Sequence, residues 1–333
     1  MADTQQEDFV IQTPAAVAQT EAGQHTLRGA SAGVELSAAD AYGLAAGESK
    51  SQARLVLSRF FHQRLAIIGL CTFAALGIAS VLVGHFWHYS YTDITNNLNS
   101  PPSATNPFGT NAIGNDMFAQ VMAGVEKDIQ IALTVAVMAT LIGVTIGAIA
   151  GYYRGWIDSA LMRFVDLVLV IPVLAILIVL AHRLAKQSDN WFGLAVIIGI
   201  LSWTYVARLV RADFLSLRER DFVEAARALG ASNKRIIVKH MLPNAVGPII
   251  VNATLTVALS IILETTLSYL GLGVQPPGVS LGLLVNQGQD SATTEWWLFV
   301  FPVVFLIILI LSIFLIGDGL REAFDPKKSR VRA

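Results

Sequence analysis

The sequence is poor in ionisable residues and in residues that crosslink a chain or bind metal. Only 14% of its 333 residues are Asp, Glu, Lys or Arg, and its single cysteine, Cys71, lies in an apolar run. One cysteine excludes an intramolecular disulfide, and no Cys/His spacing typical of a metal site is present. The G-x-x-x-x-G-K-[ST] pattern of a nucleotide-binding P-loop is also missing. We therefore expect no metal and no cofactor on this chain.

The arrangement of side chains does not indicate an enzyme. Ser202, Ser260, Ser268 and His182 are scattered along apolar runs, and His240 lies in a hydrophilic segment. A membrane hydrolase needs a nucleophile beside a base, or a placed pair of acids. Neither pairing is evident, so we expect a non-catalytic chain without catalytic residues.

Apolar residues are abundant, at 54% of the chain with a mean hydropathy of +0.58. Such a composition indicates several membrane spans rather than a soluble domain. A bilayer core of about 30 Å is crossed by about 20 helical residues. We therefore predict an all-α polytopic membrane protein with six spans, at residues 65–87, 129–152, 161–180, 192–210, 246–270 and 297–317.

The positive charges alternate between the segments that flank these spans. Of the 23 Lys and Arg residues, all but Lys127, Arg183 and Lys186 lie in alternate segments, beginning with the one before the first span. Positive residues are retained on the cytoplasmic side of a membrane. Both termini are therefore predicted to be cytoplasmic.

The two ends of the chain differ in composition from the middle. Residues 1–49 are rich in Ala, Gln, Thr, Ser and Gly, and they lack the basic start and apolar core of a signal peptide. We predict a disordered cytoplasmic tail there, with a regulatory or docking role left open. The six-span domain is expected over residues 50–326, followed by a basic cytoplasmic tail at 327–333.

Gly143, Gly147 and Gly151 recur every four residues in the second predicted span. Small residues at this spacing let two helix backbones approach closely. The spacing alone does not distinguish helix packing within the chain from a contact with another subunit.

The fifth predicted span is the least apolar, and Glu264 lies deep within it. A carboxyl group in lipid is costly, so this side chain should face the helix bundle or a wet cavity. Two interpretations are open. Glu264 lines a polar pathway together with Asn252, Thr256 and Ser260, or it is a structural acid that is hydrogen-bonded to a neighbouring helix.

A hydrophilic segment, residues 221–244, connects the fourth and fifth predicted spans. Its Glu224-Ala-Ala sequence favours a helix that ends at Gly230 in the C′ position, and Leu242-Pro243 marks the entry to the next span. One interpretation is a docking surface for a soluble partner, with the two alanines forming a small, flat face. The other is a solvated loop that only keeps positive charge inside.

Several stretches resemble the oligopeptide/dipeptide (OppC/DppC-type) permeases of ABC importers. The pattern Glu224-Ala-Ala-x3-Gly230-x9-His240-x-Leu242-Pro243 resembles the EAA signature of these permeases, although His240 stands where isoleucine is usual. The resemblance extends over about residues 50–326, with further matching stretches at 106–116, 150–163, 267–277 and 315–326. Asn106, Asn111 and Asn115 depart from the family pattern in the first of these stretches.

This resemblance implies a six-span, MetI-like type I importer permease in the plasma (inner) membrane of a prokaryote. The implied partners are a homologous second permease of the OppB/DppB type, two ATPase domains, separate or fused, and an extracytoplasmic peptide-binding protein. ATP and Mg would bind only to the ATPases. Membrane lipids are the other expected contact, and nucleic acid is not expected. The resemblance implies an ATPase-coupling helix formed by Phe222, Glu224, Ala225, Ala226, Leu229, Gly230 and Pro243.

The function implied by the resemblance is ATP-driven uptake of di- or oligopeptides by alternating access. An importer of the same architecture that carries nickel, an oligosaccharide or another small solute is the alternative. A membrane enzyme or signalling scaffold disagrees with the missing catalytic residues and with the EAA pattern.

Overall fold

The computed structural model describes residues 52–184 and 191–325, and the predicted tails at 1–49 and 327–333 lie outside them. The chain divides into two compact units at Arg54 and Leu55, and the description below concerns the second unit. The regular secondary structure of its described part is helical, and an isolated β-bridge joins Thr110 to Asp116 in the connection between two of the helices. The helices are α2 (Gln52–Phe60), α3 (Arg64–Phe86), α4 (Met117–Tyr153), α5 (Gly155–Val170), α6 (Val173–Leu184), α7 (Trp191–Leu217), α8 (Asp221–Ala228), α9 (Asn233–Arg235), the π-helix η2 (Ile236–Met241), α10 (Leu242–Tyr269), α11 (Leu281–Gly288) and α12 (Trp297–Phe324).

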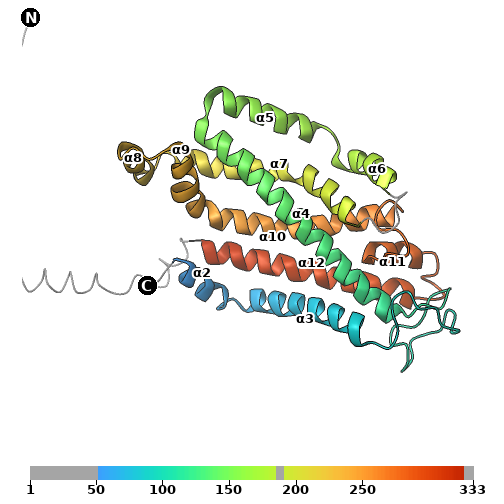
Figure 1. Ribbon diagram of the computed structural model, residues 1–333. Helices are drawn as coiled ribbons and strands as arrows, with labels where there is room; N and C mark the ends of the chain where they lie inside the picture. The colour runs from blue at the N-terminus through green and yellow to red at the C-terminus, as the bar shows by residue number, and fades with distance from the viewer. Residues whose placement is uncertain (1–51, 185–190, 326–333) are drawn as a thin grey trace, which may run out of the picture. The chain divides into compact units, whose positions relative to one another are not determined.

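The long helices form a bundle in which α4 crosses its neighbours (Figure 1). Helices α3, α12, α10 and α7 pack in that order, and α4 contacts all four of them. Helices α8 and α9 lie at one end of the bundle, and α11 lies at the other, near the long connection between α3 and α4 (Figure 1). These two ends are called the α8 end and the α11 end below.

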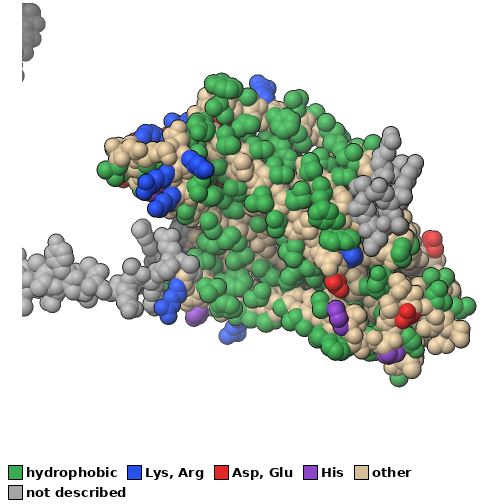
Figure 2. Space-filling view, in the orientation of Figure 1, with side chains coloured by type: hydrophobic (Ala, Val, Ile, Leu, Met, Phe, Trp, Pro, Cys, Tyr) green, Lys and Arg blue, Asp and Glu red, His purple; other side chains and the backbone are tan. Residues whose placement is uncertain are grey.

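Among the described residues, five helices are long and apolar enough to cross a membrane: α3, α4, α7, the continuous run Asn233–Tyr269, and α12. Five of the predicted spans fall on them. The surface agrees with this assignment, because apolar side chains cover the middle of the face in Figure 2, with Lys and Arg gathered at the α8 end and most of the Asp and Glu at the α11 end. Apolar residues around a bundle with charges at its ends are expected of a protein in lipid.

The third predicted span, 161–180, is not one straight helix. Helices α5 and α6 meet at an angle of 72°. Pro172 has no N–H to continue the helix and disfavours helical geometry in the residue before it. Ile171 is accordingly extended, with φ −82° and ψ 126°, and the Pro172 carbonyl accepts the first hydrogen bond of α6 from Ala175 N–H at 2.9 Å. The two helices count as one span only if the bent pair is taken together.

The second predicted span, 129–152, begins too late. Helix α4 starts at Met117, because Asp116 caps it by accepting a hydrogen bond from Ala119 N–H at 3.1 Å. The buried Asp116 carboxylate also accepts from Trp87 Nε1 at 2.8 Å and from Asn106 Nδ2 at 3.0 Å. The first turns of α4 fall outside the predicted span because their apolar residues are interrupted by polar and charged ones, ending in Glu126-Lys127-Asp128.

An ion pair joins α5 to α7 towards the α8 end. Arg211 donates to both oxygens of Asp158, Nε to Oδ1 at 2.5 Å and Nη2 to Oδ2 at 2.7 Å, and both side chains are partly buried. A second pair, Arg208 with Asp166 at 2.5 Å, joins the same helices but is half exposed. The two pairs differ mainly in burial and in the number of hydrogen bonds.

We expect Asp158→Asn to destabilise the protein by about 2 kcal/mol, because a two-bond, partly buried ionic contact is lost. Asp166→Asn is the matched control, and we expect it to cost about 0–1 kcal/mol, as for other exposed pairs. Thermal unfolding of both variants in the same detergent measures the difference. Equal shifts in Tm would contradict the distinction between the two pairs.

Candidate functional site

The segment 221–244 is the part of the chain that the sequence singles out, and it forms a short helix followed by a tight turn. Helix α8 ends in a Schellman motif: Ala231 N–H donates to the Ala226 carbonyl and Gly230 N–H donates to the Arg227 carbonyl, both at 3.0 Å. Gly230 has φ +77°, a conformation that glycine adopts without strain. The helix end predicted at Gly230 is therefore present.

One face of α8 packs onto the bundle. Val223 and Ala226 are buried, and they contact an apolar cluster that includes Phe214 of α7 together with Ile236 and Met241 of η2. Burying a valine side chain stabilises a structure by about 1.5–3 kcal/mol. The prediction of one flat face made by both alanines is therefore wrong, because Ala226 faces the bundle and Ala225 faces outward.

The opposite face of the segment is open. Glu224, Ala225, Gly230 and Pro243 are exposed, as is Phe222. Leu229, the residue that follows α8, is 88% exposed. Of the seven residues predicted to couple to an ATPase, only Ala226 is buried.

Polar contacts that the sequence did not reveal hold the base of the segment. The Tyr152 hydroxyl, at the end of α4, donates to Asn233 Oδ1 at 2.8 Å, and Arg218 donates to the Tyr152 carbonyl at 2.7 Å. These residues are far apart in the sequence, so no local pattern links them. Together they fix α9 and the end of α7 against the end of α4.

The glycine stripe lies on the face of α4 that contacts α7. A Cβ atom placed on Gly143 would lie 2.5 Å from Val206 Cβ, and one on Gly147 would lie 2.5 Å from the Ala207 carbonyl oxygen. For Gly151 the nearest atom would be Phe214 Cβ, at 2.6 Å. The close approach that the spacing predicted occurs within this chain.

The residues predicted to line a polar pathway occur every four residues along α10, and three of them are buried inside the chain. Thr256, Ser260 and Glu264 face the interior, and only Asn252 is partly exposed. The two hydroxyls donate to backbone carbonyls one turn earlier on α10. The groove of about 530 Å³ between α3, α4, α10 and α12 is lined by none of the four. Glu264 fits the second interpretation in being buried inside the bundle, although the Ser268 hydroxyl that donates to it lies on its own helix, α10.

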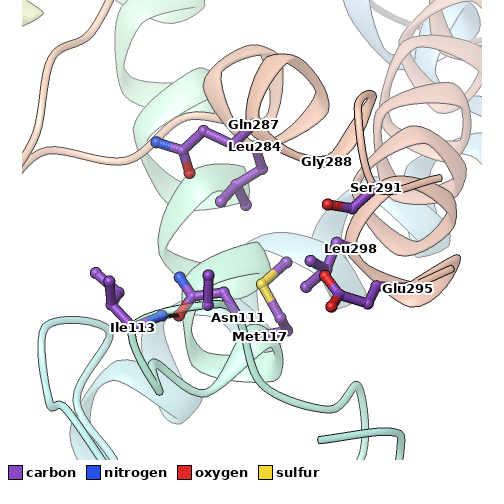
Figure 3. Close-up of a pocket in the computed structure, with 10 residues that line it drawn as sticks. Asn111, Ile113, Met117, Leu284, Gln287, Gly288, Ser291, Glu295 and Leu298 are labelled. Carbon is purple, nitrogen blue, oxygen red and sulfur yellow. Dashed lines mark hydrogen bonds between the residues drawn. The ribbon is translucent and has the colours of Figure 1, made fainter. Parts of the chain in front are cut away.

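A smaller cavity of about 290 Å³ opens at the α11 end (Figure 3). Asn111 and Ile113 approach it from the connection between α3 and α4, Leu284 and Gln287 from α11, and Glu295 from the segment before α12. Asn111 donates from Nδ2 to Asn115 Oδ1 at 3.1 Å and accepts from Asn115 N–H at 2.8 Å. Asn111 and Asn115, two of the asparagines that depart from the family pattern, thus hydrogen-bond to each other within the connection between α3 and α4.

Family models match most of the chain. Residues 143–330 match the model described as "Binding-protein-dependent transport system inner membrane component". The chain belongs to this family, and it is a multi-pass, non-catalytic permease component of an ABC transporter in the bacterial inner membrane. Residues 51–102 match the "N-terminal TM domain of oligopeptide transport permease C", which places the chain in the permease C (OppC) branch.

Relatives of known name match over nearly their whole length. The oligopeptide transport system permease protein OppC of Mycobacterium tuberculosis (strain ATCC 25618 / H37Rv) is 41% identical over 286 residues, which cover 86% of this chain and 98% of that protein. The OppC protein of Mycobacterium bovis (strain ATCC BAA-935 / AF2122/97) matches with the same identity and coverage.

The fold has a counterpart among solved structures. A chain from "Inward facing conformations of the MetNI methionine ABC transporter" in its CY5 native crystal form has a TM-score of 0.51 and 21% identity, with 63% of this chain and 98% of that chain covered. At this identity the likeness concerns the fold alone. The predicted all-α, MetI-like architecture is confirmed.

Proposed function

We propose that this chain is the permease subunit through which an ATP-driven importer takes up di- or oligopeptides by alternating access. The family is defined by transport that depends on a binding protein, and the relatives that match over nearly their whole length are named as oligopeptide permeases. Those names favour peptides over nickel or an oligosaccharide as cargo. The chain itself supplies two alternative helix packings rather than bond chemistry.

The α8 end is assigned to the cytoplasm and the α11 end to the outside. The segment from Arg208 to Lys239 is rich in Lys and Arg, whereas residues 88–126 and 270–296 contain neither. Positive residues stay on the cytoplasmic side, so both termini of the chain are cytoplasmic in this arrangement. An extracytoplasmic peptide-binding protein would then meet the α11 end.

The observation that carries the proposal is the division of α8 into a buried face and an open face. Val223 and Ala226 fix the helix to the bundle, while Glu224, Ala225 and Leu229 remain exposed. A helix fixed on one side can transmit a push received on the other. We assign the open face to contact with one of two ATPase domains, which bind the ATP and Mg, and a homologous permease would contact the second.

The test is a pair of substitutions at Gly230, made in the intact transporter reconstituted with its partners in proteoliposomes. A β-branched residue is strongly disfavoured at φ +77°, and space is not the constraint, because a Cβ here meets nothing within 4 Å. Gly230→Val is expected to abolish ATP-driven peptide uptake while ATP hydrolysis continues. Gly230→Asn, which tolerates this conformation, should retain most of the uptake.

Normal coupled uptake by Gly230→Val would contradict the assignment of this segment to coupling. Uptake of a metal or sugar but of no peptide by the wild-type transporter would contradict the cargo alone, because the coupling result does not depend on what is carried.

A further inference from the structure

Two acidic side chains face each other in the interior of the bundle, towards the α11 end. Asp128 of α4 is 1% exposed and Glu264 of α10 is fully buried. The two carboxyl groups are close enough to influence each other electrostatically, and the backbone of Leu281, at the start of α11, is a second polar neighbour of Asp128. They are 136 residues apart in the sequence, and neither takes part in the coupling surface at the other end of the molecule.

The hydrogen bonds around the pair are incomplete. Glu264 Oε1 accepts from the Ser268 hydroxyl at 2.6 Å. The Ser268 oxygen is itself occupied, because it accepts from Val274 N–H and from the Ser280 hydroxyl, each at 3.1 Å. Across the described residues, no N–H or O–H group donates with hydrogen-bond geometry to either oxygen of Asp128 or to Glu264 Oε2. Apart from the approach of the Leu281 backbone N–H to Asp128, three buried carboxyl oxygens are thus left without a well-aligned protein donor.

The described surroundings provide no positive charge to balance two carboxylates. Lys127, beside Asp128 in the sequence, instead places its ammonium group 4.9 Å from the centre of the Trp191 ring. Glu126 accepts a hydrogen bond from Gln130, and the Tyr269 hydroxyl bonds to Gln289. Helix α11 has no ionisable side chain, the first one on α12 is Asp318, and His85 on α3 is exposed and bonded to its own helix.

Two adjacent carboxylates in such a place would be very unfavourable. Each buried charge loses its hydration, and the two like charges repel strongly where the dielectric constant is low. Paired carboxyl groups at contact distance elsewhere share one proton for this reason. A single proton removes one charge and also provides the missing donor, because one carboxyl then donates to the other.

A metal ion explains the site less well. The hard cations that carboxylates bind take six or more oxygen ligands, and the nearby Ser268 hydroxyl already makes three hydrogen bonds. Within the described residues, no group of three or more His, Cys, Asp or Glu side chains could hold a metal ion.

We infer that Asp128 and Glu264 form one proton-binding site, a carboxyl–carboxylate pair whose shared proton holds α11 against α4 and α10. The link to α11 is direct. Ser280, which donates to Ser268, also caps α11 by accepting from Leu283 N–H at 3.2 Å. The backbone of Leu281 lies against Gly124, one turn from Asp128 on α4.

This role differs from coupling to an ATPase and does not depend on the proposed function. Helix α11 provides Leu284, Gln287 and Gly288 to the cavity at its end of the molecule (Figure 3). Loss of the proton would leave two like charges side by side where α4, α10 and the start of α11 meet, and their mutual repulsion would loosen one wall of that cavity. The site therefore makes the packing of α11 sensitive to pH.

Hydrogen–deuterium exchange of the α11 amides tests this inference in the intact transporter in lipid nanodiscs. Rates are measured from mildly acidic to mildly alkaline pH and divided by the intrinsic rate at each pH. If opening of α11 releases one proton, the normalised exchange of wild type should rise about tenfold per pH unit. In Asp128→Asn, whose amide donates to Glu264 without a titrating proton, this slope should vanish. Glu126→Gln is the matched control and should keep the wild-type slope.

Infrared spectra of the same samples provide a second measurement. A protonated carboxyl band present in wild type at neutral pH should be missing from Asp128→Asn, and Glu264→Gln replaces this variant if it fails to fold. Identical pH slopes in wild type and Asp128→Asn would overturn the inference. Suppression of the wild-type slope by sodium, compared with choline at the same pH, would also overturn it, because a cation would then hold the pair.

Discussion

Replacing Gly147 with alanine is expected to destabilise the protein by about 1–3 kcal/mol, although alanine favours a helix. The added methyl group would lie 2.5 Å from the Ala207 carbonyl oxygen and 2.8 Å from Val210 Cβ. These atoms belong to the backbone and to a stiff, β-branched side chain, so neither can move aside without moving α7. The two helices must separate, and the apolar contacts on either side of the stripe are lost.

The same reasoning predicts that alanine does not destabilise the protein at a glycine that has space around it. Gly77 on α3 has only Ile129 Cδ1 near an added Cβ, at 3.8 Å. Gly77→Ala should be neutral or stabilising by up to about 1 kcal/mol, since alanine is the better helix former. Thermal unfolding and the yield of monodisperse transporter in detergent measure both effects. Adding Gly143→Ala and Gly151→Ala to Gly147→Ala should abolish that yield, and three alanines tolerated together would contradict the close approach.

Val223→Asp is the second substitution for which a large effect is expected. Val223 is fully buried between α8, α7 and η2, so the new carboxylate would be buried without a partner at a cost of about 3–5 kcal/mol. The lower-energy outcome is that α8 leaves the bundle while the long helices stay folded. Peptide uptake should be lost completely, and amides of residues 221–230 should exchange at rates close to those of an unfolded segment.

Val238→Asp provides the control for this experiment. It makes the same chemical change on η2, close to α8 in sequence, but Val238 is exposed. The exchange of α8 in this variant should match wild type. Protection of residues 221–230 in Val223→Asp would show that α8 is held by something other than its buried face.

Much of the fold can be predicted from hydropathy and from the residues that favour turns. Each predicted span falls on a long helix or on a bent pair of helices. A helix is expected there because, in a bilayer, a single apolar segment can satisfy its backbone hydrogen bonds only with itself. Gly230 could be placed as a helix end because only its own backbone conformation is involved. The bend at Pro172 could not be predicted in this way. Packing against neighbouring helices determines whether a span that contains a proline stays nearly straight or bends sharply.

The sequence alone does not show whether an individual side chain faces the bundle or the outside. Ala225 and Ala226 are identical in sequence terms, and which of them faces inward depends on where α8 rests against Phe214 and Met241. Glu264 was recognised as an acid that must face the interior. Asp128 is not predicted as its partner, because Asp128 lies just before the predicted span and no local pattern relates two residues on different helices.

The π-helix η2, between α9 and α10, affects the direction in which the side chains of α10 point. Ile236 and Met241 are five residues apart, and both are fully buried in the same apolar cluster. In a regular α-helix each residue advances by about 100°, so positions five apart would point in different directions. The wider turn absorbs one residue. Ile236 and Met241 can therefore both pack beneath α8, while Thr256, Ser260 and Glu264 further along α10 face the inside of the bundle.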